Sequence, residues 1–275
     1  MNGYFRFPTI YKNIIVFVSE DDLWTVDVEK PIARRLTSNI ANVSSPIISP
    51  DGKLIAYIGN EDGNTEIYLM PINGGISKRL TYEGGHISNI TYWDKNNIYY
   101  SSSLESPFGR EYDLRMVSVK GGLSKNLKYG MIRNFSKQNK NIVLGKNTGD
   151  SARWKRYKGG TAGKLLININ GSKSNFKYLL DLNGNICSPM IIKNRVYFIS
   201  DHEGIANIYS CTLKGDDIKR HTKHKNYYVR NASFNVNQIV YQCGGRLFIY
   251  NIDTDENKHV DITYHSSKNE VCRKF

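Results

Sequence analysis

The chain has 275 residues, of which 40% are hydrophobic, and a formal net charge of +13. This length is enough for one large or two small globular domains. No apolar run approaches the length of a membrane span, and the N-terminal stretch lacks the basic and apolar regions of a secretory signal, so we expect neither a membrane segment nor a leader. The cysteines Cys187, Cys211, Cys243 and Cys272 are widely spaced, which indicates reduced thiols in a cytoplasmic protein.

Predicted strands fill the chain from one end to the other. Short runs rich in Val, Ile, Tyr and Phe lie between Asn, Asp and Gly turns, and no long segment has helical periodicity. In chain order the clearest runs are IIVFVS, LWTVDV, LIAYIG, EIYLMPI, NIYYSS, RVYFIS, NIYSCTL, QIVYQC and LFIYNI. This pattern predicts an all-β protein.

The strands belong to a repeated unit. Five residues of the second unit recur in the same order and spacing in the fifth: Gly63, Tyr68, Gly74, Arg79 and Thr81 correspond to Gly204, Tyr209, Gly215, Arg220 and Thr222. Parts of the same pattern return in the first unit, at Trp24 and Leu36, and in the third, at Gly121 and Leu127. Self-similarity at such a period is typical of repeat architectures.

Each unit reads as a four-stranded meander, with tips such as the SPDGK turn at Ser49 to Lys53. A single meander cannot bury both of its faces, so copies must stack, and stacking around a channel gives a β-propeller. We predict a six-bladed β-propeller of four-stranded antiparallel blades. The blades are expected at about residues 3–38, 43–84, 86–130, 131–185, 186–226 and 227–263, with an irregular tail at 264–275.

The first and last units each contain four complete strands, so no strand is left to complete a blade from both ends of the chain. We therefore expect an open ring without a shared strand, closed only by side-chain packing between blades 1 and 6. That seam is expected to be the least protected against local opening.

The fourth unit is long because its second hairpin extends from about Asn147 to Gly163. Its GGTAGKL segment suggests a phosphate-binding loop. However, the P-loop pattern needs glycine and a hydroxyl residue at the positions that hold Lys158 and Leu165. The segment is better explained as a glycine-rich hairpin tip.

Positive charge is spread along the chain, except for the dense block RWKRYK at residues 153–158. Spread charge is typical of a solvated surface, whereas a nucleic-acid interface concentrates its charge. We retain only the cations of the block as candidate contacts for an anion or a peptide: Arg153, Lys155, Arg156 and Lys158.

The unit SPDGKLIAY…IYLMPINGGISKRLT resembles the WD40-like (PD40) repeat of TolB-type propellers. The stretches DDLWTVD, WKRYKGGTAGKLLINI and VYFISDHEGIANIYSCTLKGDDIKRHT resemble the first propeller of tricorn protease, an archaeal serine peptidase that acts downstream of the proteasome. The resemblance covers residues 1–263. It implies a non-catalytic propeller that forms a peptide channel or filter beside a serine peptidase that degrades oligopeptides.

The same resemblance implies partners and a binding site. The second propeller, the PDZ domain and the catalytic domains would be supplied in cis or in trans, and a hexamer would form only with the full architecture. In the family a paired-arginine loop binds the carboxylate at the substrate's C-terminus. The matching stretch here, LTYEGGHISNI, has His86 and no arginine pair. His86 joins the four basic residues as a candidate peptide-channel or anion-contacting residue.

Catalytic motifs and cofactor sites are not expected in this chain. It has no G-x-S-x-G or H-E-x-x-H motif. His221 and His224 form H-x-x-H on a lysine-rich connector without a third ligand, which favours a solvated loop over a metal site. Ile186 occupies the glycine position of a calcium loop that would begin at Asp181. We predict no catalytic residue, no metal and no cofactor.

Two other functions remain open. The chain could be a stand-alone scaffold propeller that binds a protein partner, as isolated propellers often do. It could also bind nucleic acid through its basic surface, where Trp154 and Tyr157 stand among the cations as possible stacking groups.

Overall fold

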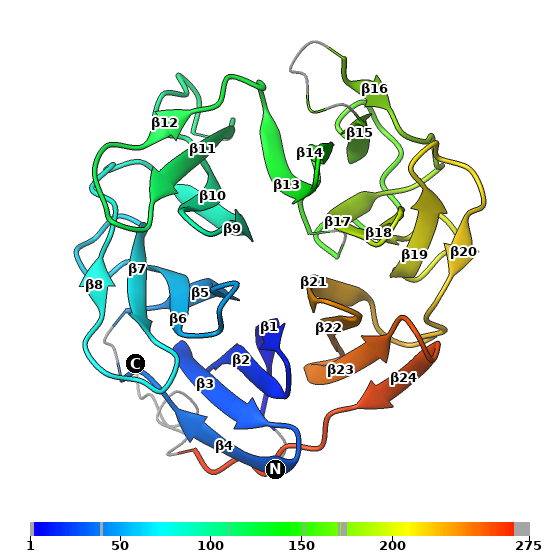
Figure 1. Cartoon of the computed structure of the whole chain (residues 1–275). Helices are drawn as coiled ribbons and strands as arrows, with labels where there is room; N and C mark the ends of the chain where they lie inside the picture. Colours follow the sequence, from blue (N-terminus) through cyan, green and yellow to red (C-terminus); the bar gives the residue numbers. More distant parts are fainter. Residues whose placement is uncertain are drawn as a thin grey trace.

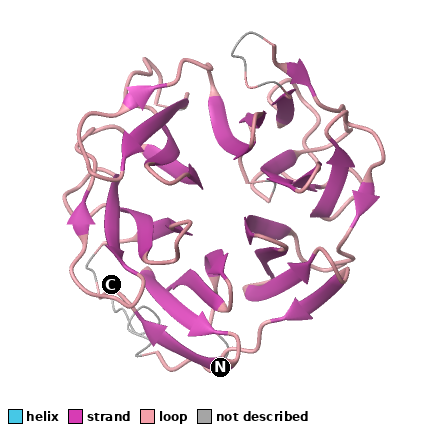
Figure 2. Cartoon of the chain, in the orientation of Figure 1, coloured by secondary structure: helices cyan, strands magenta, loops and turns pink. Residues whose placement is uncertain are grey.

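The computed structural model describes residues 3–38, 41–109, 111–150, 152–169, 171 and 175–266, and every regular element within them is a β-strand (Figure 2). The strands form six antiparallel sheets of four, each a simple meander, arranged around a common centre (Figure 1). The prediction of an all-β, six-bladed propeller is confirmed. None of the described segments is a helix that could cross a lipid bilayer.

The strands of the first three blades have the following bounds: β1 Arg6–Tyr11, β2 Ile14–Ser19, β3 Asp22–Asp27, β4 Lys30–Arg35, β5 Val43–Ile48, β6 Leu54–Gly59, β7 Glu66–Pro71, β8 Lys78–Arg79, β9 Ile87–Trp93, β10 Asn97–Ser102, β11 Asp113–Ser118 and β12 Lys125–Asn126. The last three blades contain β13 Ile132–Gln138, β14 Asn141–Lys146, β15 Lys164–Asn168, β16 Lys177–Tyr178, β17 Ile186–Ile192, β18 Arg195–Ser200, β19 Asn207–Thr212, β20 Lys219–Arg220, β21 Val229–Asn235, β22 Gln238–Cys243, β23 Arg246–Asn251 and β24 Glu256–His259.

The second strand of a blade is buried on both of its faces. In β2, β6 and β22 every residue after the first is buried, although successive side chains point to opposite sides of the sheet. Each sheet must therefore pack against a neighbouring blade on either side. This explains why these strands read as continuous apolar runs rather than as an alternating pattern.

One hydrophobic cluster fills each seam between neighbouring blades. The cluster between blades 1 and 2, for example, joins Val16 and Val18 of β2 to Ile55 and Tyr57 of β6. Equivalent clusters lie between blades 2 and 3, 3 and 4, 4 and 5, 5 and 6, and 6 and 1. The core is thus divided among six seams.

In blades 1, 2 and 5 a threonine that follows the outermost strand is hydrogen-bonded to the third strand of the same blade. Thr81 accepts a hydrogen bond from the backbone N–H of Ile67 at 2.9 Å and donates to Glu66 at 2.5 Å. In blade 5, Thr222 accepts from the Ile208 N–H at 2.9 Å and donates to Asn207 at 2.8 Å. The first blade contains the same arrangement at Thr37 and Asp22. The spacing of this threonine in the sequence therefore has a structural cause.

No strand is exchanged between the ends of the chain, as predicted: β1 to β4 form one sheet and β21 to β24 another. Blade 1 packs directly on blade 6 through a cluster that includes Phe5, Phe17 and Trp24 together with Val240 and Leu247. Figure 1 shows these two sheets side by side.

The expectation that side chains alone close the ring is wrong. The Phe5 N–H donates to the Gly245 carbonyl at 2.9 Å. Thr263 forms a parallel bridge beside β4, in which the Ala33 N–H donates to the Thr263 carbonyl at 2.9 Å. The Tyr264 ring follows, with its centroid 4.6 Å from that of Trp24. Residues 263 and 264 thus belong to the closure, and the rest of the expected tail from 267 onward lies outside the described residues.

A histidine with little exposure connects blades 5 and 6. His221 Nε2 is 2.7 Å from Ser210 Oγ on β19, and its Nδ1 is 2.7 Å from the Tyr250 hydroxyl on β23. The Tyr250 hydroxyl donates to Asp255, so the hydrogen-bond pattern fits a neutral ring that accepts from Ser210 and donates to Tyr250. The sequence analysis placed this histidine on a solvated connector, but its side chain is only 11% exposed.

The charges around His221 do not reverse the effect of burial. Burial is the largest influence and lowers the pKa of His221; Asp255 raises it, whereas Arg195 and Lys219 lower it. Because folding lowers this pKa, the folded state favours the neutral ring and the unfolded chain takes up the proton first. The contribution to stability is therefore present above the ordinary histidine pKa of 6.5 and is lost as the pH falls below it.

We predict that His221→Gln lowers the free energy of unfolding by about 1 kcal/mol at pH 7.5, through its altered hydrogen bonds. It should also reduce the loss of stability between about pH 7.5 and pH 5, since the proton uptake is removed. Urea unfolding at several pH values measures both effects. His265, whose side chain is exposed, supplies the control variant His265→Gln. An equal acid-induced loss in the two variants would contradict the assignment.

Candidate functional site

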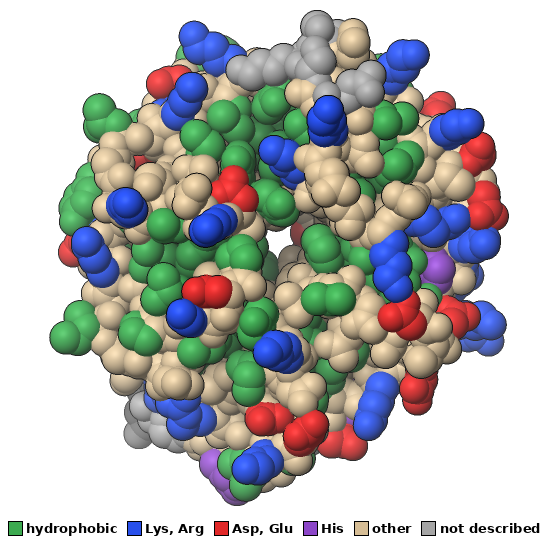
Figure 3. Space-filling view, viewed as in Figure 1, with side chains coloured by type: hydrophobic (Ala, Val, Ile, Leu, Met, Phe, Trp, Pro, Cys, Tyr) green, Lys and Arg blue, Asp and Glu red, His purple; other side chains and the backbone are tan. Residues whose placement is uncertain are grey.

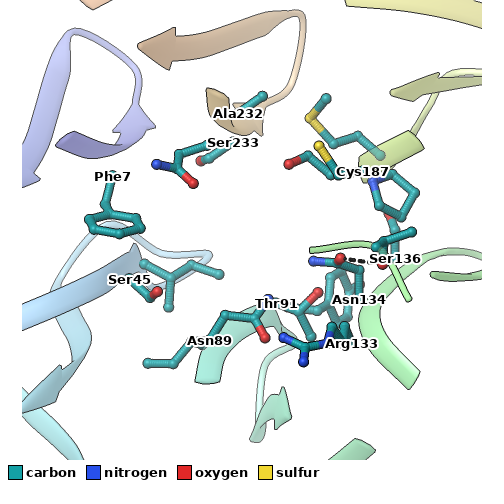
Figure 4. A pocket seen from close by; sticks show the side chains of 18 of the residues that line it. Phe7, Ser45, Asn89, Thr91, Arg133, Asn134, Ser136, Cys187, Ala232 and Ser233 are labelled. Carbon is teal, nitrogen blue, oxygen red and sulfur yellow. Dashed lines mark hydrogen bonds between the residues drawn. The ribbon is translucent and has the colours of Figure 1, made fainter. Parts of the chain in front are cut away.

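A cavity of about 950 Å³ lies at the centre of the ring. Its wall is built from the innermost strand of every blade, β1, β5, β9, β13, β17 and β21. The close-up shows one or more side chains from each of these strands around the space (Figure 4): Phe7, Ser45, Asn89, Arg133, Cys187 and Ser233. In the space-filling view an opening lies at the centre of the ring, and basic side chains are spread around the face (Figure 3).

A β-bulge recurs in the wall and shapes it. Phe7, Ser45, Ser188 and Asn231 all have positive φ, between 46° and 50°, and the strand pairing shifts register at each of them. The next residue is proline in three of the four cases. A bulge on an edge strand can accommodate a proline, because the missing N–H is not needed for pairing. The Ser-Pro pairs that open the repeats are thus bulges facing the channel.

Hydroxyl groups join the innermost strands across the seams. Thr91 accepts from the backbone N–H of Phe135 at 2.8 Å, and Ser136 accepts from the N–H of Ile191 at 3.0 Å. The Thr9 hydroxyl accepts from the backbone N–H of Ile48, with 3.4 Å between the oxygen and the nitrogen. Backbone donors that would otherwise be open at a sheet edge are used here, and most side chains of the wall are neutral polar or apolar.

The long segment between β14 and β15, residues 147–163, is described at 147–150 and 152–163, and these parts lie over one mouth of the cavity rather than extending as paired strands. Asn147, Thr148, Asp150, Arg153 and Trp154 are among its residues that line the space. Gly163 ends the segment, and a Cβ there would lie 2.1 Å from the Ile186 carbonyl oxygen. Only glycine allows this approach, so this glycine is required for packing and not for binding phosphate.

Contacts with blades 5 and 6 hold the segment over the mouth. The Arg156 N–H donates to Asp201 at 2.6 Å, and the Asn185 amide donates to the Trp154 carbonyl at 2.6 Å. Arg230 of β21 reaches the segment from blade 6, with its Nε 2.7 Å from Asp150 Oδ2. The segment therefore crosses blade 5 and is joined to blade 6 by an ion pair.

The five residues singled out in the sequence divide into two groups. His86 and Arg153 line the cavity. Lys155, Arg156 and Lys158 are exposed on the segment outside the cavity lining, with the Lys155 Nζ 5.4 Å from the centroid of the Tyr228 ring. His86 Nδ1 is 3.1 Å from the Thr65 hydroxyl.

Arg133 is a cavity residue that sequence reasoning missed. It comes from β13, and its guanidinium lies over the Tyr112 ring, 4.2 Å from the centroid. Tyr112 in turn contacts His86 edge to face, with ring centroids 5.9 Å apart. The Arg133 side chain lies on the wall of the cavity (Figure 4). No motif marks this arginine; only the fold brings it close to His86.

Comparison with known proteins identifies the family. A family model for the tricorn protease N-terminal beta propeller domain matches residues 2–256. The chain belongs to this family. A tricorn protease homolog of Saccharolobus solfataricus is 34% identical over all of this chain, which spans only 26% of that protein. A Tricorn-like protease N-terminal subunit of Sulfurisphaera tokodaii is 32% identical over 61% of this chain and 87% of the subunit.

The fold of this chain is also similar to that of a solved structure of the family. The crystal structure of the tricorn protease matches 97% of this propeller with a TM-score of 0.89 and 30% identity, and the match covers 27% of that protein. The chain thus spans about a quarter of the length of the full-length relatives it matches.

We predict that Asp150→Asn in this tricorn-family propeller loosens the 147–163 segment. The ion pair is partly exposed, so its loss should cost the whole fold under about 1 kcal/mol. Trypsin cleavage after Arg153, Lys155, Arg156 or Lys158 should nevertheless become several-fold faster, because the segment opens more often. Asp253→Asn removes an exposed ion pair with Lys193 and serves as the control. Equal cleavage rates in both variants would show that Asp150 does not hold the segment.

Proposed function

We propose that this chain is the non-catalytic propeller of a tricorn-type peptidase and that its central channel admits and filters oligopeptides. The observation that carries the proposal is the cavity itself. It has a hydrogen-bonded wall of mostly neutral polar and apolar groups, a segment over one mouth, and a few cations in its lining. An extended peptide offers matching groups, because it needs hydrogen-bond partners along its backbone and charge partners at its ends.

The five candidate residues take two roles in this proposal. His86 and Arg153 would contact a peptide inside the mouth, where a guanidinium can hold a carboxylate with two hydrogen bonds. Lys155, Arg156 and Lys158 would attract anionic peptide groups to the mouth from outside. The family's arginine pair is absent from the loop that contains His86, so any carboxylate anchor here must use other cations.

The peptidase activity itself is assigned to domains beyond this chain. Two Ser–His–carboxylate adjacencies occur among the described residues: Ser210–His221–Asp255 and Ser200–His202–Glu203. Ser210 and Ser200 are fully buried, and Ser210 also accepts a hydrogen bond from Arg195 Nε at 3.0 Å, so neither serine can reach a substrate carbonyl. We assign both groups a structural role, and among the described residues no three His, Cys, Asp or Glu side chains gather as metal ligands.

The proposed partners follow from the family. The remaining tricorn-type domains would associate with the propeller in cis or in trans, in line with a relative whose name describes a separate N-terminal subunit. A hexamer would require the full architecture. Cys211 and Cys243 are free buried thiols, which is compatible with the proposed cytoplasmic location.

Photo-crosslinking tests the channel. A purified chain incubated with an oligopeptide of about eight residues that carries benzoyl-phenylalanine should form crosslinks on β5, β9, β13 and the 147–163 segment. An excess of unlabelled peptide should suppress them. The peptide should stay intact, because the proposal places catalysis in domains other than this propeller. Mass spectrometry of the digested complex reads both outcomes.

Other results would support the other functions. Crosslinks confined to the outer strands would contradict the channel and favour a scaffold propeller. Absence of peptide crosslinks together with salt-dependent binding of single-stranded nucleic acid would favour a nucleic-acid-binding function for the basic surface. Peptide hydrolysis that one substitution in this chain abolishes would contradict the non-catalytic assignment.

A further inference from the structure

The charges on the cavity wall are unbalanced. Among the described residues that line it, Arg133, Lys137 and Arg153 are cations, and Asp150 is the single carboxylate. Asp150 already forms an ion pair with Arg230, so its charge is not available to the other three. The space between them therefore has an excess of positive charge.

Arg133 contacts only uncharged groups. Its Nη1 is 3.4 Å from the Ser88 hydroxyl, and its guanidinium covers the Tyr112 ring. It forms no ion pair with any described carboxylate. The residue is half-buried on β13, so water screens its charge less than it would at an exposed site.

Arg153 adds to this local excess from the segment over the mouth. Burial is the largest influence and lowers the pKa of Arg133; Tyr112 raises it, and the charge of Arg153 lowers it. Both guanidinium groups belong to the lining of one cavity, so their like charges repel each other. A bound anion would relieve this repulsion, and a guanidinium stacked on an aromatic ring is already oriented for such a ligand.

We propose that Arg133 and Arg153 form an anion-binding subsite in the channel, which selects peptides with acidic side chains over neutral or lysine-rich ones. This inference rests on the proposed function, in which peptides enter the channel. The ligand group is a carboxylate with its own hydrogen-bond acceptors, held by guanidinium groups from β13 and from the 147–163 segment. With this subsite, entry of a peptide into the channel depends on the charge of its side chains and not only on its terminal carboxylate.

A matched peptide series tests the proposal. The peptides have acetylated N-termini and amidated C-termini, so that neither end is charged, and they carry an uncharged fluorophore. One contains Asp and Glu, a second contains Asn and Gln at the same positions, and a third contains Lys. Fluorescence anisotropy at low ionic strength measures the dissociation constants. We expect the acidic peptide to bind about tenfold or more tightly than its amide counterpart, and the lysine peptide to bind more weakly than both.

Variants connect the discrimination to the two arginines. Arg133→Gln and Arg153→Gln should each reduce the ratio of acidic-peptide to neutral-peptide affinity several-fold. Arg153 is exposed on the segment, so its variant is expected to fold even if Arg133→Gln does not. Lys120→Gln, in the outer turn between β11 and β12, removes the same charge far from the cavity lining and should leave the preference unchanged.

The outcomes separate this inference from the function on which it rests. Equal affinities for the acidic and neutral peptides in the unmodified chain would overturn the subsite and leave the peptide channel intact. Failure of all three peptides to bind would overturn both. A preference that survives in Arg153→Gln and in a folded Arg133→Gln variant would place the selection elsewhere in the ring.

Discussion

The structure depends on the burial of both faces of each four-stranded sheet against its neighbours. A blade alone would leave two apolar faces in water, at a cost of roughly 25 cal/mol per Å² of apolar surface. In the ring every blade packs against two neighbours, so both of its apolar faces are buried. The six hydrophobic clusters are formed by these buried faces. Blade 6 must therefore pack against blade 1, even though their sheets share no strand.

The same constraint creates the channel. Because the sheets pack face to face, the first strand of each blade is left with an open edge at the centre. Bulges at positions such as Ser45 and Ser188 interrupt that edge, and hydroxyls such as Thr91 and Ser136 occupy its donors. The scaffold thus forms a largely neutral wall, and charge is brought to it by a few residues such as Arg133 and by the 147–163 segment.

Sequence reasoning found the features that repeat. The blade number, the turns and the absence of strand exchange follow from local patterns such as SPDGK and from the recurring Gly, Tyr and Thr positions. Sequence reasoning missed contacts made by residues that have no counterpart in the other repeats. Arg133 lies in a strand without a motif, and only folding brings it near Arg153. Thr263 and Tyr264 follow the last blade, where no periodic pattern predicts that they close the ring. His221 was assigned to solvent because its partners lie on a strand of another blade and on β19.

The central claim is that the ring is closed without a strand shared between the sheets of blades 1 and 6, through side-chain packing, a few backbone hydrogen bonds and the single bridge at Thr263. Native-state hydrogen exchange with mass spectrometry tests it by comparing all six seams under the same conditions. The account predicts that amides at the junction of blades 1 and 6, such as those of Phe5 and Ala33, exchange through an opening of lower free energy than amides at the other five seams. Equal protection at all six seams would contradict it.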